Sequence, residues 1–405
     1  MKPFIGRPAS VHPFPARMAP DVVIDRLRYI KRGSTVLDSM SGSGVVLRSA
    51  SSLGHQAIGV DSDPLAVLMA KVWTTTIDEV TFSRVVAEFW SHFESTELSS
   101  VELPWIDGDE LSRKYIDFWF GAEQIPSLRK MAFALYKMSG RKRRRTTLDC
   151  VDVLRIALSR IIVTKDSGAS LARDASHSRP HRVKTESDFD VELAMRKSIE
   201  KLSRILLREP PCGRVEVFRG DARDLSRLSN SSVDLVLTSP PYLNAIDYMR
   251  GHRLSLVWLG YMLSDLKDIR SENIGSERLP ASRHHDPVFA AIAESTGSID
   301  KLTSRQKGMV LRYSQDMYRV MSSLRRVLKR RGNAMFIVAD SNLKGVKVSN
   351  SNAIVSAANA VGLKLTDRTE RLIPAGSRYL PINRKSGTQL SARMKTESVL
   401  TFSHS

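Results

Sequence analysis

Residues 34–44, STVLDSMSGSG, decide the fold that this sequence predicts. Their first half is a short apolar run that ends in an aspartate, and a turn with two glycines follows at once. The next residues, 45–54, read VVLRSASSLG, which is the pattern of a helix that ends at a glycine. A strand joined to a helix by a glycine-rich turn is typical of the first unit of a parallel α/β sheet.

The same alternation of strand and helix continues beyond this first unit. Residues 57–61, AIGVD, predict a second strand, and Asp63 and Pro64 begin the helix that follows at 65–73. Strands that alternate with helices pair in parallel through right-handed crossovers, so we expect an α/β fold with a doubly wound sheet. Five later runs bring the number of predicted strands to seven: VEVFRGD at 215–221, VDLVLTSPPY at 233–242, GNAMFIVAD at 332–340, LKLTDRTERLI at 363–373 and ESVLTFSHS at 397–405. We expect the last two to pair with each other where the sheet ends.

Two segments do not follow this alternation. Residues 74–212 consist of amphipathic helical stretches joined by basic linkers, and residues 264–304 are polar and include Arg283-His284-His285. We therefore expect residues 1–73 and 213–405 to form one domain around the sheet. The segment 74–212 is then a mainly helical insert and the candidate region for DNA recognition, and 264–304 is a smaller insert.

The composition is that of a globular protein with an anionic partner. The 405 residues carry 62 lysines and arginines against 43 aspartates and glutamates, a formal charge of +19, so nucleic acid is the leading candidate partner. Two cysteines can neither form a disulfide framework nor fill a zinc site alone, which fits a reducing compartment. The sequence contains no apolar run of about 20 residues and its start lacks the apolar region of a signal peptide, so we expect a cytoplasmic protein without a membrane span.

The glycine-rich turn and the second strand together predict a nucleoside site. Glycines between a strand and a helix let a ligand approach the backbone, although the same turn also occurs without a ligand. Asp61 ends the next strand about twenty residues on, where a carboxylate accepts hydrogen bonds from ribose hydroxyls. The third glycine of the dinucleotide fingerprint is missing, so a mononucleoside such as S-adenosylmethionine fits better than a dinucleotide.

A second motif, Thr238-Ser239-Pro240-Pro241-Tyr242, follows the strand at 233–237 directly. It therefore lies at the carboxyl end of a parallel strand, where open α/β sheets bind ligands. The prolines fix the backbone and leave carbonyl oxygens free to accept hydrogen bonds, and the tyrosine offers a flat face beside them. This combination predicts a socket for a planar amine. The alternative is a proline-stiffened turn in which the tyrosine only covers the core.

With these motifs the sequence resembles the S-adenosylmethionine-dependent DNA amino-methyltransferases, which methylate exocyclic amines of cytosine or adenine. The resemblance implies a Rossmann-like, seven-stranded class I methyltransferase sheet. It assigns catalysis to the (D/N/S)PP(Y/F) motif, here Ser239, Pro240, Pro241 and Tyr242. The positions that match the family's cofactor-binding residues are Phe14, Asp38, Ser41, Gly42, Gly44, Asp61 and Asp221.

The implied chemistry explains why these residue types are needed. An exocyclic amine is a weak nucleophile, so its N–H bonds must be directed at acceptors, here the Ser239 hydroxyl oxygen and the Pro240 carbonyl. The base must also leave the duplex stack, and Tyr242 can stack on the extruded ring. The serine form of the motif is more typical of cytosine-N4 enzymes. We therefore predict cytosine-N4 methylation of duplex DNA, in a restriction-modification or related system with a cognate restriction endonuclease as a possible partner.

Three alternatives share most of these features. The same apparatus serves adenine-N6 methylation, related loops serve RNA amino-methyltransferases, and the fold can persist in a non-catalytic DNA-binding protein. The sequence Pro210-Pro211-Cys212 superficially resembles the nucleophile of cytosine-C5 methyltransferases, but it precedes the third strand instead of following the fourth, so we interpret Cys212 as a loop thiol.

Basic residues of the larger insert are the candidates for DNA phosphate contacts. They belong to the run 141–145 and to the polar stretch 165–184, and a solvated surface is the alternative for both. The residues are Arg143, Arg144, Arg145, Arg173, Arg179 and Arg182. The histidines, scattered along the chain, show no ligand spacing with cysteines or carboxylates, so we predict no metal site.

Overall fold

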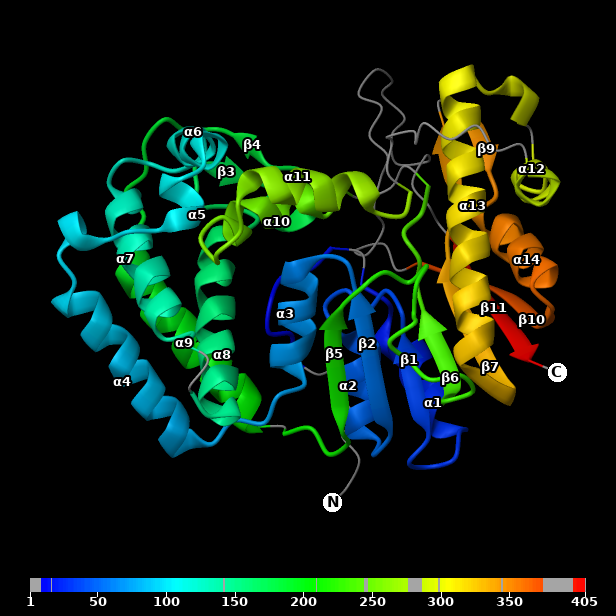
Figure 1. Ribbon diagram of the computed structural model, residues 1–405, viewed down its shortest axis with the longest axis horizontal. Coiled ribbons are helices and arrows are strands. Elements are labelled where there is room, and N and C mark those ends of the chain that lie inside the picture. Colours follow the sequence, from blue (N-terminus) through cyan, green and yellow to red (C-terminus); the bar gives the residue numbers. More distant parts are fainter. Residues whose placement is uncertain are drawn as a thin grey trace.

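The structure, a computed structural model, combines a central sheet with a helical region at its side (Figure 1). It describes residues 9–15, 17–140, 143–208, 210–243, 247–275, 286–297, 299–343, 345–373 and 396–404. The predicted motif Arg283-His284-His285 and the first two residues of the run 141–145 lie outside the described residues.

Seven strands form the sheet, as the sequence predicts. Their spatial order is β10-β11-β7-β6-β1-β2-β5, and β11 alone runs antiparallel to its neighbours. The bounds are β1 Thr35–Asp38, β2 Gln56–Asp61, β5 Val215–Arg219, β6 Val233–Thr238, β7 Leu328–Val338, β10 Leu363–Leu372 and β11 Thr396–His404. This order and direction make it the Rossmann-like sheet of class I methyltransferases, and the predicted pairing of the last two strands is confirmed.

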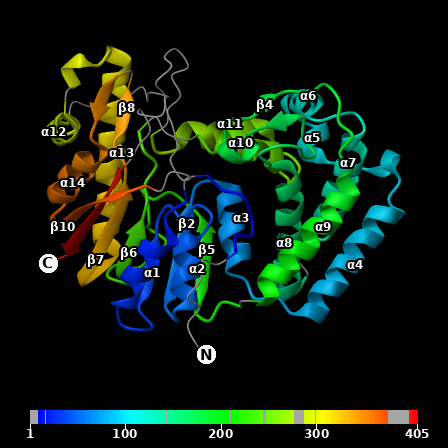
Figure 2. The ribbon, with the colours of Figure 1, turned by 180° about the vertical axis from the view of Figure 1, so that it is seen from behind.

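Helices cover both faces of the sheet because successive side chains of a strand point to opposite sides. In β1, Val36 belongs to the core cluster under α1 (Pro20–Arg28), α2 (Val45–Ser52) and α3 (Pro64–Trp73). Leu37, one residue on, belongs to the cluster under α13 (Ser304–Val327) and α14 (Asn350–Ala360). Figure 1 is seen from the α13 side, and Figure 2 shows the face that α1 and α2 cover.

The larger segment between α3 and β5 is mainly helical, as expected. Its elements are α4 Glu79–Ser95, η1 Leu98–Ser100, α5 Pro104–Asp107, α6 Glu110–Trp119, α7 Gln124–Lys137, α8 Arg145–Ile162, β3 Ala172–Arg173, η2 Ala175–His177, β4 His181–Arg182 and α9 Val191–Arg208. Helix α8 is buried along most of its length, and Lys71 of α3 donates to Asp152 of α8. One core cluster therefore runs from the sheet into this helical region. Whether the segment is a recognition domain stays a prediction.

The smaller segment at 264–304 is also helical where it is described. It contains most of α11 Leu263–Glu272, together with α12 Pro287–Glu294 and η3 Ile299–Lys301. Helix α10 Met249–Leu256 precedes it, and the short strands β8 Ser341–Leu343 and β9 Val346–Val348 follow β7. Helices α10 and α11 lie over the carboxyl edge of the sheet, toward the helical region (Figure 1). Among the described residues, no helix is both long and apolar enough to cross a membrane.

Candidate functional site

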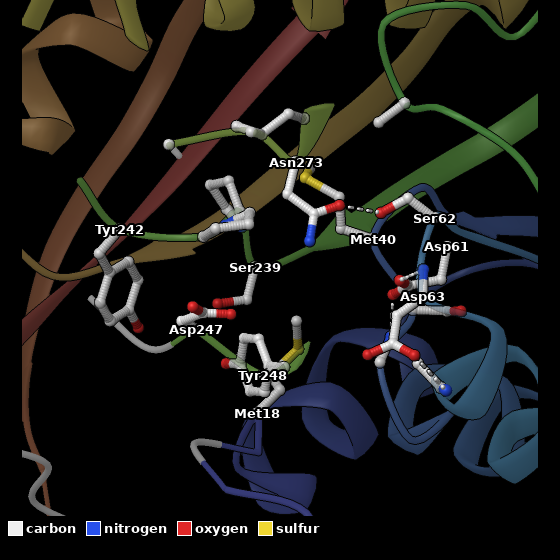
Figure 3. Close-up of a pocket in the computed structure, with 18 of the residues that line it drawn as sticks. Met18, Met40, Asp61, Ser62, Asp63, Ser239, Tyr242, Asp247, Tyr248 and Asn273 are labelled. Atoms are coloured by element: carbon white, nitrogen blue, oxygen red, sulfur yellow. Dashed lines mark hydrogen bonds between the residues drawn. The ribbon is translucent and has the colours of Figure 1, made fainter. Parts of the chain in front are cut away.

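A cavity of about 1330 Å³ lies at the carboxyl edge of the sheet, where the loops after β1, β2, β5 and β6 meet (Figure 3). Pockets for small ligands commonly measure about 300–1000 Å³, so this one has room for more than one ligand group. Its lining includes all the predicted catalytic residues and every predicted cofactor residue except Gly44. The structure thus brings the two sequence motifs, about 200 residues apart, to one place.

The two glycines of the first turn have different roles. Gly42 has a left-handed backbone with φ +49°, and a Cβ there would lie 3.1 Å from the ring of Phe14. Gly44 also has a positive φ of +90°, but its Cβ would lie 2.8 Å from the Cα of Ala70 in α3. Gly42 is therefore needed for a close approach inside the cavity, whereas the structure gives Gly44 a role in packing α2 on α3.

Two aspartates, the buried Asp38 at the end of β1 and the partly buried Asp61 at the end of β2, have raised pKa values. Burial raises the pKa of Asp38 to about 7, although its Oδ1 accepts hydrogen bonds from Thr238 Oγ1 at 2.7 Å and Met40 N at 3.3 Å. Burial, and after it the charge of Asp63, raises the pKa of Asp61 to about 6. Carboxyl groups poised near neutrality in a cavity are typical of functional sites.

Asp61 keeps acceptor capacity for a ligand. Its Oδ2 accepts from Gly42 N at 2.8 Å, and its Oδ1 accepts from Asp63 N at 3.0 Å. Each carboxylate oxygen has a second lone pair. The side chain is thus held by two backbone donors and can still accept two further hydrogen bonds, as the predicted ribose-binding acid requires.

Asp221, after β5, is held by a guanidinium that the sequence analysis missed. Arg223 Nε lies 3.0 Å from both carboxylate oxygens of Asp221, and its Nη2 lies 2.6 Å from Oδ2. Its Nη1 donates to Asp316 of α13 at 2.8 Å. The pairing of Arg223 with Asp221 could have been predicted from the sequence, because the arginine stands two residues after the aspartate. Only the tertiary structure brings Asp316 to the same guanidinium.

Ser239 is oriented by the end of the neighbouring strand. Its hydroxyl donates to the carbonyl oxygen of Ile337 in β7 at 2.8 Å. The hydroxyl has one proton, so its remaining lone pairs can only accept hydrogen bonds from a ligand. Tyr242 lines the same cavity and is packed against the core, and burial raises the pKa of its phenol.

The stretch directly after the proline motif supplies cavity residues that sequence reasoning passed over. Tyr248 stacks on Phe14, with ring centroids 5.0 Å apart and planes 13° from parallel. His252 Nδ1 lies 2.5 Å from Asp63 Oδ2, which ties α10 to the N-terminus of α3. Asp247 lines the cavity and pairs with Arg250 at 3.3 Å and Arg270 at 2.5 Å.

The predicted phosphate-binding arginines fall into two separate groups. Arg143 and Arg145 stand at the N-terminal end of α8 and pair with Glu88 and Asp149, at 2.5 Å and 3.1 Å. Arg144 is exposed between them. Residues 173, 179 and 182 follow the other end of α8, and Arg179 lines the cavity. Because an 18-residue helix is about 27 Å long, the structure does not bring the two groups together.

The described residues contain no cluster of three or more metal-binding side chains, and Cys212 is an exposed free thiol. The groups that line the cavity include carboxylates, hydroxyls, backbone carbonyls and basic side chains.

Comparison with known proteins places the chain near methyltransferases. No family model matches the sequence. A curated relative, the type II methyltransferase M.BsoBI of Geobacillus stearothermophilus, is 21% identical over 272 residues, covering 60% of this chain and 51% of the relative. The chain thus spans about half the length of that relative.

Three solved structures that are similar to the chain are described as methyltransferases or methylases, and their TM-scores lie between 0.23 and 0.31. A TehB-like SAM-dependent methyltransferase of Corynebacterium glutamicum has a TM-score of 0.30 at 10% identity, covering 95% of this chain and 87% of its own. An rRNA methyltransferase of Streptomyces viridochromogenes has a TM-score of 0.31 at 12% identity, covering 97% and 88%. A Thermus thermophilus protein described as a DNA modification methylase has a TM-score of 0.23 at 16% identity, covering 46% and 50%. The strand order, and not these likenesses, defines the fold as that of a class I methyltransferase.

Proposed function

We propose that this protein is an S-adenosylmethionine-dependent methyltransferase that acts on the exocyclic N4 amine of cytosine in duplex DNA. One observation carries the proposal. The loop with Gly42, the carboxylate of Asp61 and the proline motif at 239–242 line a single cavity. Its volume of about 1330 Å³ has room for a nucleoside cofactor and an extruded base together.

The cofactor side of the cavity has groups that fit S-adenosylmethionine. The hydroxyl oxygens of Ser39 and Ser41 are buried and have no hydrogen-bond partner among the described residues, so they can take up a polar ligand. Asp61 can accept from ribose hydroxyls, and the missing side chain of Gly42 lets the ring of Phe14 lie close to this turn. The bound cofactor would supply a methyl group activated by a positively charged sulfur.

The catalytic side orients the amine. Ser239 Oγ and the Pro240 carbonyl are the proposed acceptors for its two N–H groups, which directs the nitrogen lone pair toward the methyl group. The new N–CH₃ bond forms as the S–CH₃ bond breaks, and the nitrogen then loses one proton to solvent. Extruding the base costs a few kcal/mol, and stacking on Tyr242 would offset part of that.

DNA as the substrate is supported by charge and by one relative. The net charge of +19 suits a phosphate backbone, and Arg173, Arg179 and Arg182 belong to the β3–β4 segment beside the cavity. The curated relative is a type II methyltransferase. We extend the proposal to a restriction-modification or related system with a cognate endonuclease. Adenine-N6 methylation is the second candidate, because the same acceptors would serve its amine.

Mass spectrometry of nucleosides tests the proposal directly. Purified protein is incubated with S-adenosylmethionine and either duplex DNA or RNA that contains varied sequences, and a sample without cofactor is the control. We expect N4-methyldeoxycytidine in the DNA. N6-methyldeoxyadenosine would move the function to the second candidate, and methylated RNA alone would exclude a DNA substrate. DNA binding without any methylated nucleoside would identify a non-catalytic protein.

A further inference from the structure

We propose that Asn273, in the segment after α11, is a specificity-determining residue that recognises a ribose hydroxyl of the cofactor. The inference rests on the proposed function, because it takes the nucleoside ligand to be S-adenosylmethionine. The glycine-rich turn and the aspartates at the strand ends define the proposed cofactor site. Asn273 adds to this site a polar group that comes from the segment after α11.

Asn273 stands next to the predicted ribose-binding acid. Ser62 directly follows Asp61 at the end of β2, and its hydroxyl donates to Asn273 Oδ1 at 3.0 Å. All three side chains line the cavity. In Figure 3 the amide nitrogen of Asn273 points into the open space between Ser239 and Asp61.

The segment that carries Asn273 is fixed to the loops that form the nucleoside side of the cavity. Arg223 Nη2 donates to the carbonyl oxygen of Glu272 at 2.8 Å, and the same guanidinium holds Asp221. Arg312 of α13 donates to the carbonyl oxygen of Ser271 at 3.1 Å. Asn273 is therefore held in place by its two preceding residues as well as by Ser62. A polar group held in this way binds a ligand without a large loss of conformational entropy.

Asn273 and Asp61 offer complementary hydrogen-bonding groups. With Oδ1 engaged by Ser62, Asn273 presents an NH₂ group, for which the described part of the chain supplies no acceptor. Asp61 presents only acceptors. A hydroxyl group can donate one hydrogen bond and accept others. A ribose hydroxyl can therefore donate to Asp61 and accept from Asn273 at the same time. A deoxyribose that lacks this hydroxyl cannot use both residues.

Calorimetric titration with S-adenosylhomocysteine and with its 2′-deoxy and 3′-deoxy analogues tests the proposal. We expect Asn273→Ala to weaken binding of S-adenosylhomocysteine about tenfold, the effect of one lost hydrogen bond. One of the two deoxy analogues lacks the hydroxyl that Asn273 recognises. The wild-type protein and Asn273→Ala should bind that analogue with equal affinity. Asn273→Asp retains the acceptor for Ser62 but places a second carboxylate near Asp61, so at pH 8 it should bind more weakly than the alanine variant.

Asn352→Ala is the matched control, because the Oδ1 of Asn352 also accepts from a side chain, Arg368 Nη1 at 2.9 Å, but Asn352 lies outside the cavity lining. It should bind all three ligands like the wild type. Equal losses for all three ligands in Asn273→Ala, or no loss for any, would overturn the role of Asn273 and leave the proposed function intact. A wild-type protein that binds no S-adenosylhomocysteine would instead remove the proposed function itself.

Discussion

The carboxyl edge of the sheet and the helical region at 79–208 both carry many charged residues. The two regions differ in the groups that surround their carboxylates. At the sheet edge, Asp38 is buried and Asp61 partly buried, each against neutral donors, and desolvation raises the pKa values of both. In the helical region, Glu88 pairs with Arg143, whose hydrogen bonds lower the pKa of that carboxyl.

This contrast shows where the fold contains groups that destabilise the folded state. A buried carboxylate without a cationic partner destabilises the folded state, whereas a surface ion pair contributes only about 0–1 kcal/mol. Locally unfavourable groups concentrate at functional sites. The contrast predicts large effects on function for changes at the sheet edge and small effects for changes at the distant end of α8.

The largest expected effect comes from Ser239→Ala. The variant keeps the cofactor groups but loses an acceptor for the amine, so the single-turnover rate should fall about 100-fold, as for other preorganised hydrogen bonds. Affinity for S-adenosylmethionine should remain that of the wild type. Rapid-quench measurement of methyl transfer checks the rate, and calorimetry checks the affinity.

Ser323→Ala is the control, since this hydroxyl also donates to a backbone carbonyl, that of Arg223 at 2.8 Å, but lies outside the cavity lining. It should keep the wild-type rate. A wild-type rate in Ser239→Ala would contradict the proposed catalytic role of the loop.

Asp38→Asn should stabilise the protein at high pH. The folded state retains a proton on Asp38 between about pH 3.8 and 7, where the unfolded chain has lost it, so wild-type stability falls as the pH rises through this interval. Asparagine keeps the acceptor for Thr238 and removes the charge. Urea unfolding should show the variant more stable by about 2–4 kcal/mol at pH 8, with a smaller difference at pH 5.

Asp234→Asn provides a control of opposite sign. Burial opposes ionisation there as well, but hydrogen bonds from Lys329 and from Thr35 N outweigh it and lower the pKa of Asp234. The variant should therefore lose stability at pH 8. If Asp38→Asn were also less stable than the wild type at pH 8, the contrast between uncompensated and compensated carboxylates would fail.

Asp61→Asn should weaken cofactor binding and change its dependence on pH. The pKa of Asp61 is raised to about 6, so below pH 6 the wild-type carboxylate gains a proton and loses acceptor strength. Affinity for S-adenosylhomocysteine should fall up to about tenfold per pH unit there. The variant should bind about tenfold more weakly at pH 8 and show no such fall. Titrations from pH 5 to pH 8 measure both, and an identical slope in the variant would assign the dependence to another group.

The smallest effects should come from the two groups of arginines. Each phosphate contact contributes about 0.9 to the slope of log K against log[salt] for duplex DNA. Replacing Arg173, Arg179 and Arg182 with alanine should reduce the slope by about 2–3. Replacing Arg143, Arg144 and Arg145 should reduce it less, because two of them already pair with acids.

Binding of a short duplex at several salt concentrations compares the two triple variants. Equal reductions would mean that the DNA also reaches the far end of α8. An unchanged slope in the first variant would remove the β3–β4 segment from the proposed interface.

Much of the architecture could be predicted from local patterns. All seven strands lie where apolar runs with turn residues at their ends indicate them, and the order of the sheet agrees with the resemblance. The cavity gathers the predicted acids and the proline motif because the carboxyl ends of parallel strands share one edge. The role of each residue in binding and catalysis stays a prediction.

Other features depend on contacts that no local pattern contains. Gly44 has the same signature as Gly42, but only the packing of α2 on α3 shows that its missing side chain makes room for Ala70. The Phe14–Tyr248 stack joins residues far apart in sequence. The raised pKa of Asp61 depends on burial by surrounding elements, which a strand-end position alone does not specify.

Short-range features can be read from the sequence: where strands and helices begin, which turn needs a left-handed glycine, and which polar residues follow each strand. Tertiary structure decided which of those groups meet and in what state of charge. Arg223 bridges Asp221, Glu272 and Asp316, and Ser62 orients Asn273, although its partner stands more than 200 residues later in the chain. The physical reason is that hydrogen bonds and desolvation act over a few ångströms in space, whereas a sequence pattern records only separation along the chain.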